Sequence, residues 1–536
     1  MVYKSIFLQI SFLFGLTFLF SCQSSQGDGQ IEISIRQRRQ LERTNDEVLE
    51  AKVDSLLNEM TLAEKVGQMT QLNNNVYAQE FKASASESAP PEIQVSIDTN
   101  KLIPLIRDYH IGSFLNGIGV SPEIWYEYGK ELQELNFRYS RVDIPLIYGM
   151  DHVHGANYLD WSTVFPHNIN LGATFNDQMS TDEARILARE SADLGHHWIF
   201  APIMGIGRNP LWPRFYETYG EDPYLCGRMG VAFTKELEKA SEDIAPYRQA
   251  ACVKHYIGYS DPRNGWDRRP AWIPDQHLYE FYVPSFKAVI DAGVKTVMVN
   301  GGEINGIPVH ASHKLLTKLL RDELKFTGVV VTDWEDVRRL YRTHKVVENM
   351  EEAVLLAIHS GIDISMTPYT TDFPKVLAKL VQDGKISMER IDLSVARILR
   401  LKYQLGLFDH PFPRNDRFER IASKEHLMKA RQAARESIVL LKNEDEMLPL
   451  EKRGKRYVMA GLNADSRMGL AGGWTLRWVA NSDDIFSEKI NTFYQALKAV
   501  LPASEVILAN ADNIKTQGGK ADAIILAVGE SPYAEG

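Results

Sequence analysis

Charged side chains follow or interrupt several apolar runs of the chain, where an enzyme built on buried strands would carry its chemistry. Asp151 follows the run "IPLIYGM", and Asp333 follows "GVVVT". Lys254 and His255 stand together inside the run "QAACVKHYIG", where two polar groups are costly unless they are hydrogen-bonded or line a cavity. Arg214 lies among aromatic and acidic residues in "PRFYETYGEDP". One acidic residue at a strand end more often caps or pairs than catalyses, but several such positions together predict an active site.

These residue types suit a sugar better than a metal, a phosphate or an acyl group. His152 and His154 are two positions apart without an HExxH or CxxC motif, so the sequence does not predict a zinc site. It has neither a phosphate-binding glycine loop followed by Lys and Ser/Thr nor a Gly-x-Ser-x-Gly elbow. The remaining carboxylates, basic donors and tryptophans bind hydroxyl groups and stack on the apolar faces of sugar rings.

A barrel of parallel strands would bring these side chains together. Short apolar runs alternate with helical patterns such as 180–195 and 310–326, which predicts parallel strands covered by helices. The runs lie at 144–151, 197–204, 249–258, 294–300, 328–334 and 361–366. A helical pattern at 46–71 precedes them, with Thr61 and Glu64 spaced as a capping box. Over residues 46–405 this repetition favours an α/β fold with a (β/α)8 barrel, whose active site lies at the carboxyl ends of the strands.

A second domain follows the barrel. The stretch 405–418 has no period and is rich in Pro, Asp and Arg, so we place a linker at 406–423. A helical pattern at 424–441 opens the region 424–536, whose apolar runs lie at 456–462, 505–510 and 522–529. These runs predict a smaller α/β sandwich domain. We expect it to be incomplete in this chain, because the last run ends shortly before Gly536.

The composition is that of a globular protein without nucleic-acid partners. The 536 residues suffice for two or three domains, and 44% hydrophobic with 24% charged residues provides a sizeable core. The formal net charge is −10, and no basic stripe accompanies it. Both observations argue against binding to nucleic acid.

Residues 1–22 predict export and a lipid anchor. One Lys precedes an apolar run that is too short for a comfortable membrane span, and "LFSC" then ends at Cys22. This pattern resembles a bacterial lipoprotein signal, in which the Cys becomes the lipidated first residue. The polar residues 23–45 are expected to form a linker, and Cys226 and Cys252 are too few for a disulfide scaffold. We therefore expect a protein tethered to a membrane, in the periplasm or at the outer membrane.

From about residue 46 to its end, the chain resembles glycoside hydrolase family 3, the β-glucosidase and exo-β-glucanase family. The resemblance rests on the order and spacing of eight stretches, none of which carries it alone. They are "EMTLAEKVGQMTQ", "YGMDHVHGAN", "PRFYETYGEDP", "VKHYIGYSD", "GVVVTDWEDVRR", "GLFDHPFP", "GGWTLRW" and "VGESPYAEG". The resemblance implies the barrel and second domain that the patterns predict, and it implies no cofactor or metal.

The resemblance also implies roles for individual residues. Asp333 matches the nucleophile and Glu535, in "YAEG", the general acid/base, a role for which Glu530 competes. A nucleophile beside Lys and Arg would keep a low pKa, while an acid on a less charged second-domain loop would hold its proton. Glu303 follows another apolar run and is a further candidate, and Gly301 stands where the family often has an aromatic residue. The residues that match substrate contacts are Asp151, Arg214, Lys254, His255, Trp334, Arg339 and Trp478.

The resulting hypothesis is an exo-acting, retaining β-glucosidase that acts on β-glucosides and β-gluco-oligosaccharides. Family 3 also contains β-xylosidases, which remain an alternative. Its β-N-acetylglucosaminidases carry an acid/base His after a "KHFPGHG"-like run, whereas this chain has "KHYIGYSDP". A non-catalytic glycan-binding lipoprotein would use the same aromatic and charged residues without turnover. Trp478 also has a simpler interpretation, as a core residue of the second domain.

Overall fold

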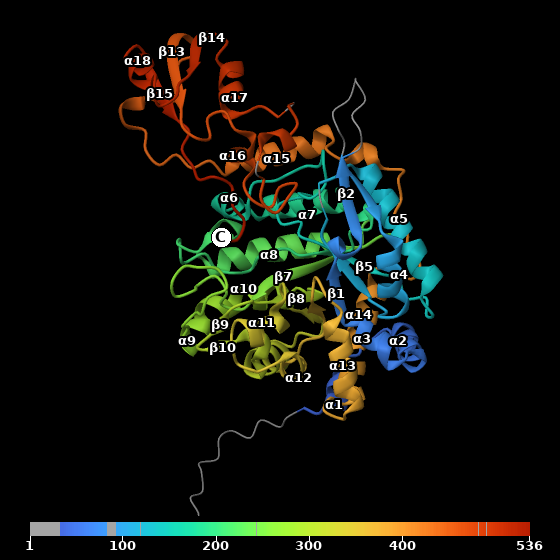
Figure 1. Cartoon of the computed structure of the whole chain (residues 1–536). Helices are drawn as coiled ribbons and strands as arrows, with labels where there is room; N and C mark the ends of the chain where they lie inside the picture. Colours follow the sequence, from blue (N-terminus) through green and yellow to red (C-terminus); the bar gives the residue numbers. More distant parts are fainter. Residues whose placement is uncertain (1–32, 83–92, 118, 243, 481, 489) are drawn as a thin grey trace, which may run out of the picture.

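The computed structural model shows a barrel with a second region at one end (Figure 1). The structure describes residues 33–82, 93–117, 119–242, 244–480, 482–488 and 490–536. The predicted signal segment 1–22, with Cys22, lies outside the described residues. Within the described residues, no helix has both the length and the hydropathy needed to cross a membrane.

Eight parallel strands form the barrel, in the order β11-β8-β7-β6-β5-β4-β1-β12. A parallel bridge between Val331 and Ile364 joins the two ends of this order and closes the ring. The strands are β1 (Thr70–Asn73), β4 (Ser113–Leu115), β5 (Ile147–Met150), β6 (Trp198–Ile199), β7 (Ala250–Tyr256), β8 (Thr296–Val299), β11 (Val329–Val331) and β12 (Ser365–Met366). The predicted barrel is thereby confirmed.

Helices follow the strands along the chain and surround the ring (Figure 1). Every residue of β7 is buried, as expected for a strand with the barrel interior on one face and helices on the other. The surrounding helices are α4 (Thr99–Arg107), α5 (Pro122–Tyr139), α6 (Asn168–Ala173), α7 (Asp177–Ser191), α8 (Pro223–Leu237), α10 (Val283–Asp291), the π-helix η6 (Lys314–Glu323), α11 (Asp336–Arg342), α12 (Met350–Ser360), α13 (Asp372–Gln382) and α14 (Met388–Gln404).

The predicted helix 46–71 is two helices. α2 (Glu47–Glu59) ends before Met60, whose backbone is extended, and α3 (Leu62–Gln68) begins after Thr61. The Thr61 side chain accepts a hydrogen bond from the Glu64 N–H, and the Glu64 carboxylate accepts one from the Thr61 N–H. The predicted capping box is confirmed, and it starts a new helix there rather than continuing the old one.

The prediction of a linker at 23–45 is wrong for its described part, because α1 (Ile35–Leu41) packs against the barrel helix α14. Directly after α1, the buried Glu42 carboxylate accepts two hydrogen bonds of 2.7 Å from the Arg397 guanidinium. α1 buries no residue of its own, so ion pairing rather than apolar packing holds this segment. A polar, Arg-rich sequence shows no apolar period from which this could be predicted.

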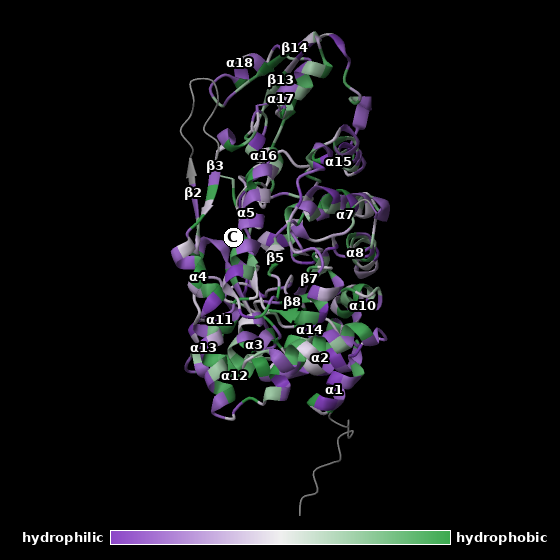
Figure 2. Cartoon of the chain, turned by 90° about the vertical axis from the view of Figure 1, so that its right-hand side faces the viewer, coloured by the Kyte–Doolittle hydropathy of each residue, from purple (hydrophilic) through white to green (hydrophobic). Residues whose placement is uncertain are grey.

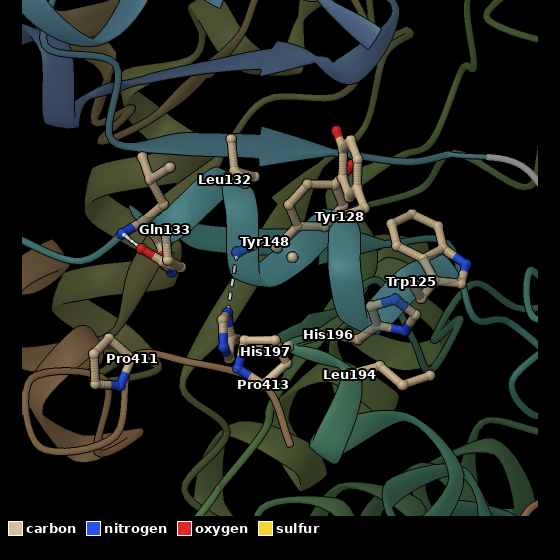
Figure 3. Close-up of a pocket in the computed structure, with 13 residues that line it drawn as sticks. Trp125, Tyr128, Leu132, Gln133, Tyr148, Leu194, His196, His197, Pro411 and Pro413 are labelled. Carbon is tan, nitrogen blue, oxygen red and sulfur yellow. Dashed lines mark hydrogen bonds between the residues drawn. The ribbon is translucent and has the colours of Figure 1, made fainter. Parts of the chain in front are cut away.

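The predicted linker 406–423 is hydrogen-bonded to the barrel. Pro411 and Pro413 line a cavity of about 20 Å³ beside His197 (Figure 3). The Tyr247 hydroxyl donates to the Phe412 carbonyl at 2.7 Å, and the Arg414 N–H donates to the Asp193 carbonyl at 2.8 Å. The chain therefore leaves the barrel at a defined place.

The helix that we expected to open the second domain belongs to the barrel by its packing. α15 (Lys424–Glu436) contacts α6 and α7, and its Ala430 and Ala433 lie in the barrel's hydrophobic core. The second region therefore begins structurally after α15, and not at residue 424.

The second region is a three-stranded parallel sheet with short helices. β13 (Arg453–Ala460) is central, between β14 (Ala503–Leu508) and β15 (Ala523–Leu526), as the three apolar runs predict. Its helices are α16 (Arg467–Ala471), α17 (Phe493–Val500) and α18 (Ile514–Gly518). Figures 1 and 2 show this sheet at the end of the barrel opposite α1. The C-terminus lies below the sheet, against the barrel. Trp474 and Ala534 accordingly belong to the barrel's core cluster.

Candidate active site

A cavity of about 680 Å³ lies where the second region meets the carboxyl ends of the barrel strands. Barrel residues form its floor, and residues 474–479 together with Glu535 form part of its wall. The structure brings most of the predicted site residues to this cavity: Asp151, Arg214, Lys254, His255, Asp333, Trp334, Arg339, Trp478 and Glu535 line it.

Asp333 lies at the floor, two residues beyond the end of β11. Its Oδ1 accepts a 2.6 Å hydrogen bond from the Trp334 N–H, and its Oδ2 accepts one of 3.0 Å from Nη2 of Arg268. His255 Nε2 lies 3.8 Å from the same Oδ2. Both carboxylate oxygens are thus fixed, and the group is 7% exposed, as suits a preoriented nucleophile.

Asp151 and Lys254 form a buried ion pair beside Asp333. Lys254 belongs to β7 and Asp151 follows β5, and Nζ of Lys254 donates to Oδ1 of Asp151 at 2.8 Å. The pairing offsets the desolvation of two charges inside the barrel. Burial, with Arg214, Lys254 and Arg268 nearby, lowers the pKa of His255 well below its usual value. His255 is therefore a neutral ring, able to donate a hydrogen bond from one nitrogen.

Arg214 connects the barrel to the second region. Its Nε and Nη2 donate to the two oxygens of Glu217 at 2.8 and 2.9 Å, and its Nη1 donates to Oε1 of Glu535 at 2.7 Å. Glu217 also accepts a 3.0 Å hydrogen bond from Nε1 of Trp474. Two segments of the second region are therefore held on one short barrel element, η3 (Pro213–Glu217).

Glu535 is surrounded by more positive charge than the sequence predicts. Its Oε2 accepts a 3.0 Å hydrogen bond from Nη1 of Arg268, in addition to the bond from Arg214. Burial disfavours the charged carboxylate, but Arg268 and Arg214 outweigh burial and lower its pKa to about 2. The expectation that this acid lies on a less charged loop and holds its proton is therefore wrong for this arrangement, in which Glu535 is ionised.

Two tryptophans lie at the cavity mouth. Trp334 packs edge-on against Tyr369, with ring centroids 5.5 Å apart. Trp478 is 53% exposed, which contradicts the alternative that it is a core residue of the second domain. The buried tryptophan of "GGWTLRW" is instead Trp474, which is 6% exposed. Arg339 Nε donates to the Trp334 carbonyl at 3.2 Å, so its guanidinium lies beside this aromatic mouth.

Two candidate carboxylates lie outside the cavity lining. Glu303 is in the short strand β9 (Glu303–Ile304), and its Oε1 is bonded to Nδ1 of His344 at 2.6 Å. The prediction that Glu303 contacts substrate is therefore not supported by its position. Glu530 is exposed in the segment after β15, whereas the Glu535 carboxylate accepts a hydrogen bond from Arg214 of the barrel.

Sequence reasoning missed Arg268, Glu217 and Glu80. Arg268 stands in the loop after β7, so no apolar run ends beside it. Glu80 belongs to the hairpin of β2 (Ala78–Lys82) and β3 (Ile93–Ile97), and its Oε2 lies 4.0 Å from Nη1 of Arg477 across the cavity mouth. The position of Glu217 could have been inferred from the stretch "PRFYETYGEDP", because an acidic residue three positions after Arg214 can form an ion pair with that arginine. Among the described residues, no group of three or more His, Cys, Asp or Glu is placed to hold a metal ion.

Family models match both regions of the chain. Residues 61–401 match the glycosyl hydrolase family 3 N terminal domain, and residues 438–536 match the C-terminal domain of the same family.

Curated relatives are glycosidases of two specificities. The lysosomal beta glucosidase of Dictyostelium discoideum is 40% identical over 470 residues, which cover 83% of this chain and 56% of the relative. The periplasmic beta-glucosidase of Salmonella typhimurium is 31% identical over 482 residues, covering 89% and 58%. A beta-xylosidase of Formosa agariphila is 32% identical over 350 residues, covering 63% and 48%. The chain thus spans somewhat more than half the length of the first two.

A solved structure has a similar overall fold. The exo-1,3/1,4-beta-glucanase of a Pseudoalteromonas species superposes with a TM-score of 0.79 at 29% identity, over 92% of this chain and 60% of that one.

Proposed function

The chain belongs to glycosyl hydrolase family 3, and from its cavity we propose that it is an exo-acting, retaining β-glucosidase. Its substrates would be β-glucosides and β-gluco-oligosaccharides, from which it removes one terminal glucosyl residue at a time. The observation that supports this most is the joining of Asp333 and Glu535 by a single guanidinium at the cavity floor. Two carboxylates this close suit a double displacement, for which a separation of about 5–5.5 Å is typical.

In the proposed reaction, Asp333 attacks the anomeric carbon and Glu535 protonates the departing oxygen. Water then attacks the glucosyl–Asp333 ester, with Glu535 as general base. The Asp151–Lys254 pair and neutral His255 would bind hydroxyl groups of the terminal sugar. Trp334 and Trp478, at the mouth, would stack on the next sugar.

Glu535 must gain a proton before it can act as the acid. Substrate hydroxyls that accept hydrogen bonds from Arg214 would replace a contact that now holds Glu535 ionised. Losing a cation raises the pKa of a carboxyl, by about 1–3 units per close opposite charge. Substrate binding would in this way convert an ionised carboxylate into the protonated acid.

The experiment that tests this function is hydrolysis of 4-nitrophenyl β-glucoside. Turnover is expected in the natural chain, and Asp333→Asn should abolish it while circular dichroism stays unchanged. Glucose release with retained β-configuration, followed by NMR, would establish the stereochemistry. If the natural chain binds cello-oligosaccharides but releases no nitrophenol, it is a glycan-binding protein and the proposal is wrong.

A β-xylosidase is the second candidate, because a beta-xylosidase is among the similar proteins. A xylosyl residue lacks the hydroxymethyl group of glucose, so the two substrates differ by one pocket contact. The ratio of kcat/KM for 4-nitrophenyl β-glucoside and β-xyloside decides between them, and a ratio below one favours the xylosidase.

We also propose that the protein is exported and anchored through Cys22, in the periplasm or at the outer membrane. The lipoprotein-like signal at 1–22 motivates this, and a relative of this chain is named as periplasmic. Labelling with an alkyne fatty acid should mark the natural protein but not Cys22→Ser. Recovery of unlabelled protein in the cytosol would overturn the proposal.

A further inference from the structure

Among the described residues, Arg268 is the one whose side chain is hydrogen-bonded to both carboxylates of the proposed reaction. Nη2 donates to Oδ2 of Asp333 at 3.0 Å, and Nη1 donates to Oε2 of Glu535 at 3.0 Å. Nη1 also donates to Oδ2 of Asp267 at 2.8 Å. The side chain is only 13% exposed, so these contacts are made largely away from water.

Arg268 occupies space that Gly301 leaves open. A Cβ at position 301 would lie 3.2 Å from Nε of Arg268 and 3.1 Å from Oδ1 of Asp336. Both distances are shorter than ordinary contacts, so any side chain at 301 would press on both groups. In this chain, the Arg268 guanidinium and the buried Asp336 carboxyl fill the space beside Gly301.

We propose that Arg268 is a positioning residue that sets the spacing of Asp333 and Glu535, and that Gly301 makes room for it. The proposal rests on the proposed function, since these two carboxylates are its reacting groups. The guanidinium is planar and rigid, and its two Nη atoms are fixed relative to each other. Two carboxylates bound to neighbouring Nη atoms are therefore held at a defined separation, which a flexible point charge such as Lys would not impose.

Asp336 supports Arg268 from behind without competing for it. Its side chain is fully buried, and neither carboxylate oxygen has a hydrogen-bond partner among the described residues. Burial and the neighbouring Asp333 raise its pKa to about 8, against the lowering effects of Arg268 and Arg339. At neutral pH it is therefore mostly protonated, which leaves the charge of Arg268 to Asp333, Glu535 and Asp267.

The same arrangement predicts a response to alkaline pH. The charged and titratable groups that face Asp336 are Asp333, Arg268 and Arg339, whose Nε is 3.8 Å away, and the buried His310 ring. Burial and His344 lower the pKa of His310 to about 3, so that ring does not change charge in this range. Once Asp336 ionises, it attracts Arg268 away from the two reacting carboxylates, and activity should fall.

The first test compares Arg268→Ala and Arg268→Lys with Arg269→Ala, an exposed neighbour in the same loop. Arg268→Ala should lower kcat by about 10²-fold, the cost of misplacing reacting groups. The loss should be larger for cellobiose than for 2,4-dinitrophenyl β-glucoside, because a poor leaving group needs a well-placed acid. Arg268→Lys should remain impaired, and Arg269→Ala should be unaffected. Millimolar guanidinium, but not ammonium, should partly rescue Arg268→Ala.

The second test perturbs the same contact without touching Arg268. Gly301→Ala should lower kcat by crowding the guanidinium, and Asp336→Asn should keep neutral-pH activity while removing the activity loss above about pH 8. If the natural chain hydrolyses glucosides and either Arg268→Ala or Arg268→Lys keeps a normal kcat, the inference about Arg268 is wrong and the proposed function stands.

A natural chain without turnover would instead contradict the proposed function. Glucose affinity, measured by tryptophan fluorescence, then still tests Arg268, because misplaced carboxylates should weaken binding by about tenfold. Unchanged affinity in Arg268→Ala would overturn the inference in that case as well. If that variant fails to fold, Gly301→Ala and Arg268→Lys decide by the same measurements.

Discussion

Binding of glucose should make the protein take up protons, because glucose hydroxyls compete with Glu535 for Arg214. In the substrate-free site the pKa of Glu535 is about 2, so at pH 5 the carboxyl is almost fully ionised. Relieving Arg214 of this contact raises the pKa of Glu535 by about 1–3 units. At the upper end of this range, a pKa of about 5 in the complex corresponds to an uptake of about half a proton per glucose at pH 5.

The free energy needed to raise the pKa of Glu535 is within what the hydrogen bonds of a bound sugar can supply. Each pKa unit corresponds to about 1.4 kcal/mol, so a change of three units requires about 4 kcal/mol from the binding contacts. Hydrogen bonds between charged groups and sugar hydroxyls contribute about 1.5–3 kcal/mol each. Two or three such bonds are therefore enough to bring Glu535 into the range where a general acid functions.

Isothermal titration calorimetry at pH 5 measures the uptake directly. The observed enthalpy of glucose binding should depend on the ionisation enthalpy of the buffer, and the slope is the number of protons taken up. Glu535→Gln should bind glucose without this dependence. A natural chain that binds glucose with the same enthalpy in every buffer would refute the reasoning, since Glu535 would then stay ionised.

Three further predictions concern Trp478, Lys254 and Arg397. Trp478→Ala should raise KM for disaccharides by about 3- to 10-fold, the worth of one stacked ring, with little change for 4-nitrophenyl β-glucoside. Lys254→Met leaves Asp151 unpaired in the barrel, and urea unfolding should show a loss of about 3–5 kcal/mol together with loss of activity. Arg397→Met leaves the buried Glu42 without its guanidinium partner and removes one of the arginines that pair with Asp363, so it should lower the free energy of unfolding by about 3–5 kcal/mol. Arg36→Ala removes an exposed ion pair and should change it by less than about 1 kcal/mol, and equal losses in both would contradict the argument.

Strand-end reasoning succeeded where a polar residue interrupts or ends an apolar run. Lys254 and Asp333 were predicted in this way. A charged side chain in or directly after a buried strand is costly unless it has a hydrogen-bond partner or lines a cavity. β1 and β4 were missed because their sequences, "TQLN" and "SFL", are too short or too polar to show a period. Six of the eight strands still sufficed to indicate a barrel.

The charge environment of Glu535 was beyond sequence reasoning. Arg268 lies 267 positions from Glu535 in the sequence, in a loop without a strand beside it. Its position depends on the loop's path past Gly301 and Asp336, which no local pattern encodes. The sequence therefore predicted that Asp333, Arg214 and Glu535 meet. The pKa of Glu535 depends also on Arg268, which no sequence pattern marks.

The pairing of Glu42 with Arg397 also bears on how the barrel folds. These residues are 355 positions apart, so the contact between α1 and α14 closes almost the whole ring in a single loop. Closing a flexible loop of that length costs about 5 kcal/mol of chain entropy. The contact therefore cannot form early, and it becomes favourable only after the intervening strands have shortened the effective loop. We expect the ion pair to fasten a ring that is otherwise complete, so that its removal would speed unfolding far more than it slows folding.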